Sequence, residues 1–239
     1  MLRSDLLYRV RLLFPDPRFE VPRIWSNLEL RKFARLFDGS VVNVSAWRDE
    51  DKEGSRYKSY FERAREYWIT NYRADARGWQ DDAQDQVFLD LEKPLPAELE
   101  GRFDVVFNHT TLEHVFDVHA AFSNLCLMAR DVVIVVVPFL QEQHGEYGDY
   151  WRFTPLCVER LFGLNGMSLA YISFNDGPGD AVYVFAVGVR DAEKWPEIAR
   201  MDGNRVADLK RVFIGGGVVR KPGLVSRLIR QAALRLWAR

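Results

Sequence analysis

The sequence lacks several features that mark well-known classes of protein. It has two cysteines in 239 residues, Cys126 and Cys157, which are too few for a disulfide framework. Its four histidines and two cysteines show none of the short spacings of zinc ligands, so we expect no metal site. No apolar run reaches the ~18 residues that a membrane-spanning helix needs. These absences favour a protein of the reducing cytoplasm.

The charge is distributed unevenly along the chain. Hydrophobic residues make up 48% and charged residues 28%, a mixture that can bury a core of its own. Residues 209–239 carry +8, and because the whole chain carries −1, residues 1–208 carry −9. A basic tail on an acidic body predicts an anionic partner or surface for the tail.

Three regions differ in composition. Residues 1–25 contain three prolines and an opening unlike a signal peptide, and we expect an extended lead-in. Residues 26–200 alternate helix and strand patterns. Residues 201–239 form a basic extension, in which 222–239 have the apolar spacing of an amphipathic helix lined with arginines. Such a helix can pack on its own domain, dock on a protein partner, or lie on an anionic membrane at the inner face. The acidic body argues against nucleic acid.

Seven short apolar segments predict the strands of one sheet. They are residues 41–44, 67–70, 86–89, 103–107, 132–137, 168–174 and 181–189. Residues 132–137 are apolar at every position, which indicates a central strand buried on both faces and ended by Pro138. The glycines around Pro178 predict that the last two strands form an antiparallel pair.

The segments between the strands predict helices. They are expected over residues 27–38, 56–66, 117–130, 155–163 and 191–200. Ser26 is placed to cap the first of them, and Thr154 the fourth. Strands separated by helices predict a doubly wound, mostly parallel α/β sheet with an antiparallel C-terminal hairpin.

Two motifs carry a family resemblance. One is Phe-Asp-Val-Val-Phe-Asn-His-Thr-Thr-Leu-Glu-His-Val at 103–115, and the other is Tyr-Gly-Asp-Tyr-Trp-Arg-Phe-Thr-Pro at 147–155. With the order of the strands, residues 27–190 resemble the class I S-adenosylmethionine-dependent methyltransferases of the small-molecule type. The second motif is similar to a segment of members from glycan and surface-polysaccharide pathways. The resemblance implies a Rossmann-like fold, S-adenosylmethionine as cofactor, and a hydroxyl of a sugar or glycan as methyl acceptor.

The resemblance also implies where the cofactor binds. The residues at the matching positions are Asn43, Ser45, Asn71, Asp90, Leu91 and Asn108. The family carries an acidic, glycine-rich loop after the first strand and an acid after the second. Here the first loop has no glycine, and asparagines stand at both acidic positions. An asparagine accepts a hydrogen bond without the assistance of charge. A non-catalytic methyltransferase-like subunit of a glycan-biosynthesis complex is therefore the second hypothesis.

The acceptor site is expected in the loops after the fourth and fifth strands. His109 and His144 are the candidate bases, and Tyr147, Tyr150 and Arg152 the candidate substrate contacts. Another interpretation stays open, in which His109 is packed in the fold and Arg152 forms a local salt bridge.

Overall fold

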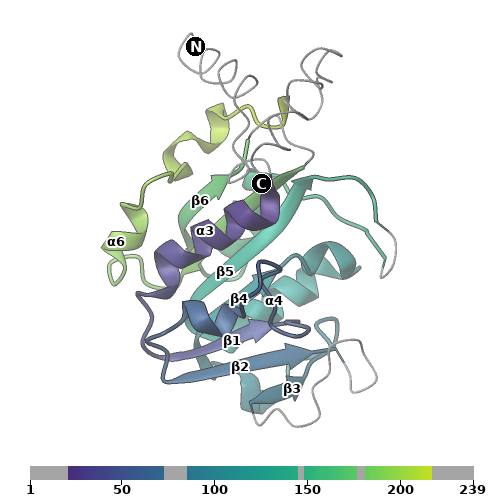
Figure 1. Ribbon diagram of the computed structural model, residues 1–239, viewed down its shortest axis with the longest axis vertical. Helices are drawn as coiled ribbons and strands as arrows, with labels where there is room; N and C mark the ends of the chain where they lie inside the picture. The colour runs from purple at the N-terminus through teal and green to yellow at the C-terminus, as the bar shows by residue number, and fades with distance from the viewer. Residues whose placement is uncertain (1–20, 73–84, 145–147, 177–180, 217–239) are drawn as a thin grey trace.

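The computed structural model describes residues 21–72, 85–144, 148–176 and 181–216 (Figure 1). The strands are β1 (Ser40–Val44), β2 (Glu66–Asn71), β3 (Gln86–Phe88), β4 (Phe103–His109), β5 (Ala129–Leu140), β6 (Ser168–Phe174) and β7 (Val182–Val189). The α-helices are α3 (Pro22–Ala34), α4 (Val118–Met128), α5 (Pro155–Leu164) and α6 (Pro196–Ala199). The 3₁₀ helices are η1 (Tyr57–Tyr60), η2 (Ala97–Leu99), η3 (Leu112–His114) and η4 (Val206–Arg211).

The seven strands form one sheet in the order β3-β2-β1-β4-β5-β7-β6. Strands β1 to β5 pair in parallel, whereas β7 pairs antiparallel with both β5 and β6. This arrangement confirms the predicted mostly parallel sheet with an antiparallel hairpin. The chain first builds outward from β1 to β3 and then resumes with β4 on the other side of β1, so the strand order reverses between β1 and β4.

Strand β5 lies inside the sheet, between β4 and β7. Its residues Val132–Val137 are buried, as their apolar run predicted, because β4 and β7 flank the strand and helices cover both faces. The prediction that Pro138 ends the strand is wrong, since β5 continues to Leu140. Pairing with β4 ends at Val136, and the pairing with β7 is irregular between Pro138 and Leu140, so the missing N–H is tolerated there.

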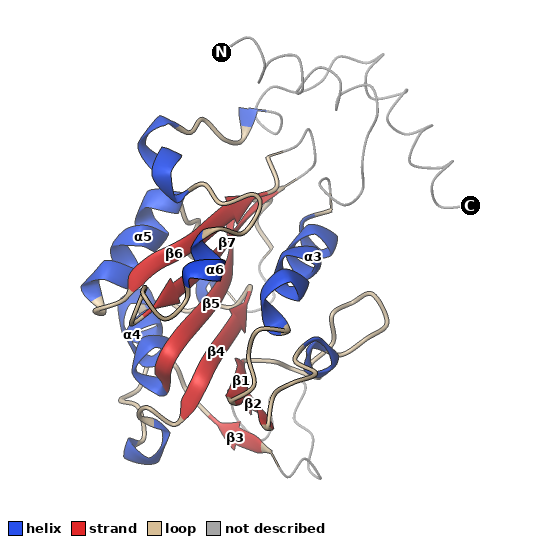
Figure 2. Ribbon diagram, turned by 90° about the vertical axis from the view of Figure 1, so that its left-hand side faces the viewer, coloured by secondary structure: helices blue, strands red, loops and turns tan. Residues whose placement is uncertain are grey.

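Helices lie on both faces of the sheet (Figure 2), and a separate hydrophobic core lies against each face. On one face α4 and α5 contribute Phe122 and Phe162, whose ring centroids lie 4.9 Å apart. On the other face α3 contributes Phe33, which contacts Tyr171 and Phe185 of the hairpin at 4.7 and 5.5 Å. Helix α3 therefore joins the first part of the chain to its last two strands.

Helix α3 begins earlier than predicted. It starts at Pro22, in the first helical turn where the missing N–H costs nothing, and ends at Ala34 rather than near 38. Ser26 does not cap it, because the Ser26 hydroxyl donates to the carbonyl of Arg23 at 3.0 Å from inside the helix. By contrast, Thr154 caps α5 as predicted and accepts the N–H of Cys157 at 3.1 Å.

Two other expected helices are shorter in the structure. The segment predicted over 56–66 forms only the 3₁₀ helix η1, and that predicted over 191–200 forms only α6. Residues 205–211 pack on the domain, since Arg205 donates its N–H to Ile172 at 2.9 Å and Leu209 is buried. The predicted helix 222–239 lies outside the described residues. Among the described helices, none is both long and apolar enough to cross a bilayer.

Candidate active site

The carboxyl ends of β1, β2, β4 and β5 lie at one edge of the sheet, because these strands are parallel. In doubly wound folds ligands bind at such an edge, where the strand order reverses. Asn43 pairs in register with Phe107, and Val44 with Asn108. The sheet therefore brings together the residues that the sequence placed at the cofactor site from β1, β2 and β4.

The loop after β1 has an unusual backbone. Ser45, Trp47 and Asp49 all have left-handed backbone angles, with φ of 56°, 54° and 61°. A residue with a side chain pays roughly 1–2 kcal/mol for this conformation, which glycine adopts readily. Every second residue of this loop, from Ser45 to Asp49, therefore adopts a backbone angle that glycine favours, although none of them is glycine. Such strain is often stored at functional sites.

Asp49 holds this loop from inside. Its carboxylate accepts the Nδ2 of Asn43 at 2.8 Å, the hydroxyl of Tyr67 at 2.6 Å and the N–H of Lys58 at 2.9 Å. Burial raises the pKa of Asp49, although these hydrogen bonds act to lower it. Asn43 therefore makes a structural contact on the α3 side of the sheet.

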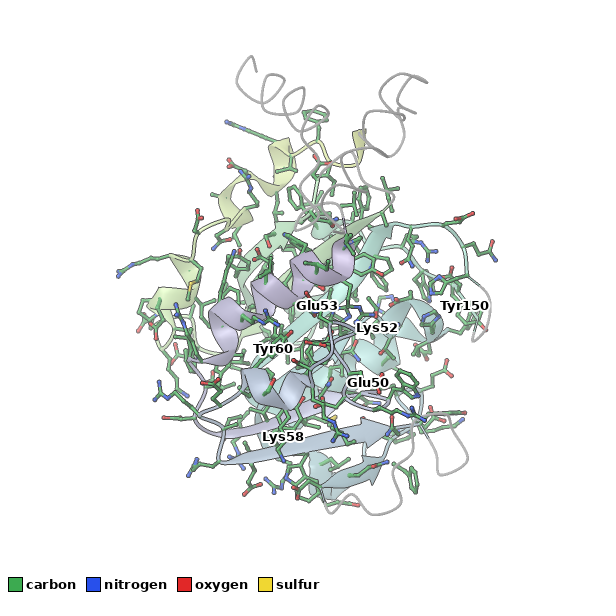
Figure 3. All side chains as sticks on the ribbon, viewed as in Figure 1. Glu50, Lys52, Glu53, Lys58, Tyr60 and Tyr150 are labelled. Carbon is green, nitrogen blue, oxygen red and sulfur yellow. The ribbon has the colours of Figure 1, made fainter. Side chains whose placement is uncertain are left out.

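The rest of the loop is fastened to α3 (Figure 3). Asn27 donates to the carboxylate of Glu53 at 2.7 Å and to the carbonyl of Asp51 at 3.0 Å. The buried Asp51 carboxylate accepts the hydroxyl of Tyr60 at 2.7 Å. The loop between β1 and η1 is consequently built as part of the fold.

Strand β2 ties down the start of the same loop. The N–H of Ser45 donates to the hydroxyl of Thr70 at 3.0 Å, and the side chain of Asn71 donates to the carbonyl of Trp47 at 3.2 Å. Asn71 stands where the family carries the ribose acid. Here its amide group stabilises the loop after β1.

Asn108 is a buried polar residue of β4, one of the two strands between which the strand order reverses. Its Nδ2 donates to the carbonyl of Val44 at 3.0 Å. Its Oδ1 is fully buried and meets no hydrogen-bond donor among the described residues. A buried acceptor without a donor is costly, and a bound ligand commonly provides the donor.

Asp90 and Leu91 follow β3 at the same edge. The half-buried Asp90 carboxylate accepts the N–H of Glu92 at 2.9 Å. Leu91 is buried, and its carbonyl accepts the side chain of Asn124 at 2.9 Å. Asn124 thereby fixes the turn that carries both residues.

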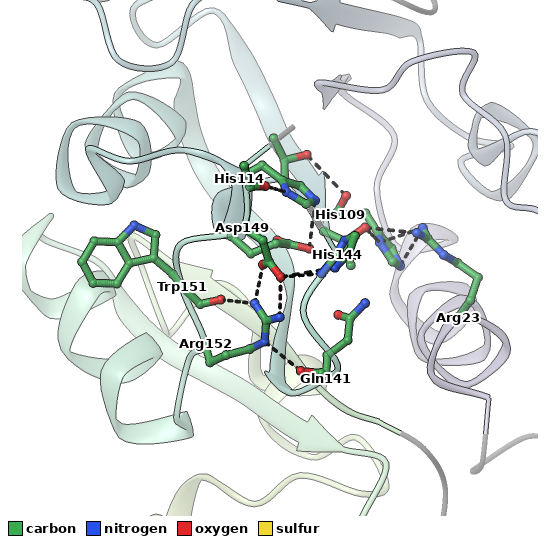
Figure 4. Close-up of polar contacts among 12 residues, drawn as sticks. Arg23, His109, His114, Gln141, His144, Asp149, Trp151 and Arg152 are labelled. Carbon is green, nitrogen blue, oxygen red and sulfur yellow. Dashed lines mark hydrogen bonds and ion pairs between the residues drawn. The ribbon is translucent and has the colours of Figure 1, made fainter. Parts of the chain in front are cut away.

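His109 ends β4 and is firmly packed (Figure 4). Its ring nitrogens lie 2.8 Å from Nη1 of Arg23 and 2.8 Å from the hydroxyl of Ser26. Burial, with the charges of Arg23 and Lys52, holds the pKa of His109 well below its usual range. The imidazole is therefore neutral at physiological pH, with hydrogen bonds to α3 on both sides.

The loop after β5 is docked on η3. The ring of His114 lies 2.5 Å from the carbonyl of Gly148, and Nε1 of Trp151 donates to the carbonyl of Val115 at 3.0 Å. The carbonyl of Glu113 accepts the N–H of Tyr150 at 2.7 Å. These bonds fix residues 148–153 against the end of β4.

An ion pair organises the side chains of this second loop. Arg152 binds both carboxylate oxygens of Asp149, at 2.5 and 2.7 Å. Arg152 is the leading reason that the pKa of Asp149 is low. His144 is about half exposed and lies 3.4 Å from the same carboxylate. Tyr150 is exposed at the rim, and Tyr147 lies outside the described residues.

Two residues of this site were not among the predicted site residues. Arg23 comes from the segment expected to be an extended lead-in, and it reaches Thr110 at 3.0 Å as well as His109. Glu113 lies in η3, just after β4. It is 1% exposed, and burial raises the pKa of its carboxyl to about 8. The one sequence signal for Glu113 as a site residue was its position directly after the apolar Leu112 in the turn.

We expect Ser45→Gly to raise the free energy of unfolding by about 0.5–1 kcal/mol, because glycine relieves the left-handed strain but is more flexible when unfolded. Urea unfolding followed by tryptophan fluorescence measures the change. Ala46→Gly is the matched control, since Ala46 has no left-handed angle, and it is expected to lower stability. A loss of stability in Ser45→Gly would show that the loop needs the serine side chain.

Comparison with known proteins bears on the fold. No family model matches the sequence, and no curated protein matches it. One similar solved structure is the 1,6-didemethyltoxoflavin-N1-methyltransferase of Burkholderia thailandensis, which has 1,6-didemethyltoxoflavin and S-adenosylhomocysteine bound. Its sequence is 17% identical, and its fold matches with a TM-score of 0.50 over 79% of this chain and 86% of that chain. The CurJ carbon methyltransferase is 14% identical with a TM-score of 0.51, over 78% and 58% of the two chains. A Bacillus halodurans protein classed as a methyltransferase is 9% identical with a TM-score of 0.52, over 68% and 97%.

The fold is that of the class I methyltransferases. The structural likeness, at 17% identity or below, concerns the fold alone. Within the described part of the chain, no group of three or more histidine, cysteine or acidic side chains could hold a metal ion.

Proposed function

We propose that the protein is an S-adenosylmethionine-dependent methyltransferase that modifies a hydroxyl of a sugar or surface glycan. The observation that carries this proposal is the methyltransferase sheet with polar side chains at its point of reversal. In such a sheet the edge between β1 and β4 is the ligand site.

The residues at this edge fit the cofactor. The buried Oδ1 of Asn108 would accept a hydrogen bond from an ammonium or hydroxyl group of S-adenosylmethionine. The half-buried Asp90 would bind the adenine end, and Ser45 lies in the loop that would hold the methionine end. When bound, S-adenosylmethionine supplies an electrophilic methyl group on a sulfonium. The protein aligns that group with the acceptor.

The rim of the second loop supports a sugar-like acceptor. Tyr150 is 52% exposed, and its ring lies 5.3 Å from that of Phe116, which is 67% exposed. Exposed aromatic rings offer faces on which a sugar ring can stack. His144 is about half exposed beside this loop and is proposed to bond to hydroxyls together with Tyr147. Arg152, a predicted substrate contact, instead holds the loop, because its guanidinium already donates to Asp149 and to backbone carbonyls.

The setting that we propose is the cytoplasm, with residues 222–239 bound to a protein partner or to an anionic membrane surface. The charge of the tail supports this assignment, because it opposes the charge of the body and of anionic lipid. The tail itself lies outside the described residues.

A second function, that of a non-catalytic subunit, has one specific observation in its favour. The side chains of Asn43 and Asn71 both bond within the fold, to Asp49 and to the carbonyl of Trp47. In the related enzymes these positions are acidic and serve the cofactor. A domain that has lost cofactor binding keeps such residues only for stability.

Transfer of label from methyl-tritiated S-adenosylmethionine separates the two functions. The acceptors would be nucleotide sugars and lipid-linked oligosaccharides, separated by chromatography after incubation with the full chain. The enzyme is expected to label a glycan fraction. Absence of label in every fraction, together with failure to bind the cofactor, would favour the non-catalytic subunit.

A further inference from the structure

Glu113 is a buried acid whose side chain contributes little to the hydrogen bonding of the fold. It lies in η3, just beyond the carboxyl end of β4, and is 1% exposed. Its Oε2 meets no hydrogen-bond donor among the described residues, and its Oε1 lies 3.8 Å from Nε2 of His114. Only its backbone is firmly held, through the carbonyl that accepts Tyr150.

The charged neighbours of Glu113 are already paired with other groups. Arg23 of α3 binds His109 and Thr110, and Arg152 of the second loop binds Asp149. Asp149, Tyr183 of β7 and His114 are further titratable groups beside this carboxyl among the described residues. The Oε2 atom of Glu113 therefore lies in a polar environment without a hydrogen-bond donor among the described residues, whereas the carboxyl has weak contacts to its own N–H and, through Oε1, to His114.

Glu29 shows what a structural buried glutamate looks like in the same fold. It is 6% exposed, and its carboxylate accepts the hydroxyl of Tyr171 at 2.6 Å, the hydroxyl of Ser173 at 3.0 Å and the ammonium of Lys32 at 2.6 Å. The fold provides hydrogen-bond donors for both carboxylate oxygens of Glu29, whereas Oε2 of Glu113 has none among the described residues. Unpaired buried acids at a ligand edge are characteristic of functional sites.

We propose that Glu113 is the proton acceptor of methyl transfer, and that the methyl acceptor is a hydroxyl or amine that donates a hydrogen bond to its Oε2. This inference rests on the proposed function. The acceptor oxygen or nitrogen bonds to the methyl carbon, and the carbon–sulfur bond breaks with its electron pair remaining on sulfur. The O–H or N–H bond breaks, and the proton passes to the Glu113 carboxylate.

Other candidate bases are less suited to this step. The ring nitrogens of His109 are both occupied, and its pKa is held low by burial. His144 is 44% exposed and sits beside the Asp149 carboxylate. Glu113 combines enclosure with an unpaired oxygen. Its pKa of about 8, raised by burial, predicts transfer that speeds up as pH rises through that value.

The test compares Glu113→Gln, Glu113→Asp and the matched control Glu29→Gln in the full chain. Transfer from methyl-tritiated S-adenosylmethionine is measured between pH 6 and 9, with nucleotide sugars, catechol and tyramine as probes. Glu113→Gln is expected to slow transfer at least about 100-fold, in line with general base catalysis. It should leave the affinity for S-adenosylhomocysteine within about twofold. Glu113→Asp should recover part of the rate and its rise with pH.

Thermal melts give a readout that needs no acceptor. The pKa of Glu113 in the folded state lies above the usual 4.5. The stability that this raised pKa contributes is therefore complete below pH 4.5 and is lost as pH rises through about 8. Glu113→Gln cannot ionise and should melt above the wild-type protein at pH 8–9. Glu29→Gln should melt below it, because three hydrogen bonds to the carboxylate are weakened.

Three outcomes would overturn the inference. They are a Glu113→Gln variant that melts below wild type throughout pH 5–9, one that transfers label at the wild-type rate, and transfer confined to carbon or thiol acceptors. Failure to bind S-adenosylhomocysteine would instead overturn the proposed function. The melts would still report on Glu113 in that case, so the two failures are distinguishable.

Discussion

Asp49→Ala is expected to lower the free energy of unfolding by about 3–5 kcal/mol. The change leaves the buried donors of Asn43 and Tyr67, and the partly buried N–H of Lys58, without their acceptor, and each unsatisfied buried group costs about 1–3 kcal/mol. Alanine must also adopt the left-handed angle of residue 49, where φ is 61°. Chemical unfolding, with fluorescence and circular dichroism as two probes, measures the loss.

Asp49→Gly separates the two causes of this loss. Glycine removes the same carboxylate but accepts the left-handed angle, so the glycine variant should be the more stable by about 0.5–1 kcal/mol. If Asp49→Ala lost less than about 1 kcal/mol, the buried network could not be what shapes the loop after β1.

Asn108→Leu is expected to weaken the binding of S-adenosylhomocysteine at least about 10-fold, because a hydrogen bond to a charged group is worth about 1.5–3 kcal/mol. Leucine has a similar size but offers no oxygen to the cofactor ammonium. It also loses the 3.0 Å bond to the carbonyl of Val44. Isothermal titration on the folded variant measures the affinity.

Asn165→Ala is the control for this variant. Asn165 bonds to the carbonyl of Leu161 at the end of α5, close to the start of β6 and so at the opposite edge of the sheet. Its loss should reduce stability and leave the affinity unchanged. Equal affinities for wild type and Asn108→Leu would remove Asn108 from the cofactor site.

The strands were predictable from the sequence because each buried strand is a short, continuous run of apolar residues. Residues 132–137 are apolar at every position, and the structure buries them all in an inner strand of the sheet. The N-cap of α5 was equally predictable, because Thr154 directly precedes Pro155 at the start of the helix. Local signals of this kind need no knowledge of distant neighbours.

Features that depend on distant neighbours were not predictable. Helix α3 begins at Pro22 because Arg23 and Ser26 bond to His109, a residue more than eighty positions away. Strand β5 continues through Pro138 because its pairing with β4 already ends at Val136, so no N–H is needed at Pro138 for a bond to β4. Neither cause can be read from the residues around the element itself.

The same difference applies to the site. The parallel strands place Asn43, Asn71 and Asn108 at one edge, as their positions at the ends of the predicted strands indicated. The direction of each side chain depended on partners that no pattern names, such as Asp49 for Asn43. Glu113 stands out only in three dimensions, where a buried acid is seen to lack a partner.

Isothermal titration of the full chain with S-adenosylmethionine and S-adenosylhomocysteine tests whether this sheet edge binds the cofactor. Micromolar binding of both is expected, with about 2.7 kcal/mol of added stability when the ligand is at one hundred times its dissociation constant. Binding of that strength would mean that the glycine-free loop at Ser45 still holds the cofactor. No binding at millimolar ligand would contradict the enzymatic function and leave the fold as the support of another protein.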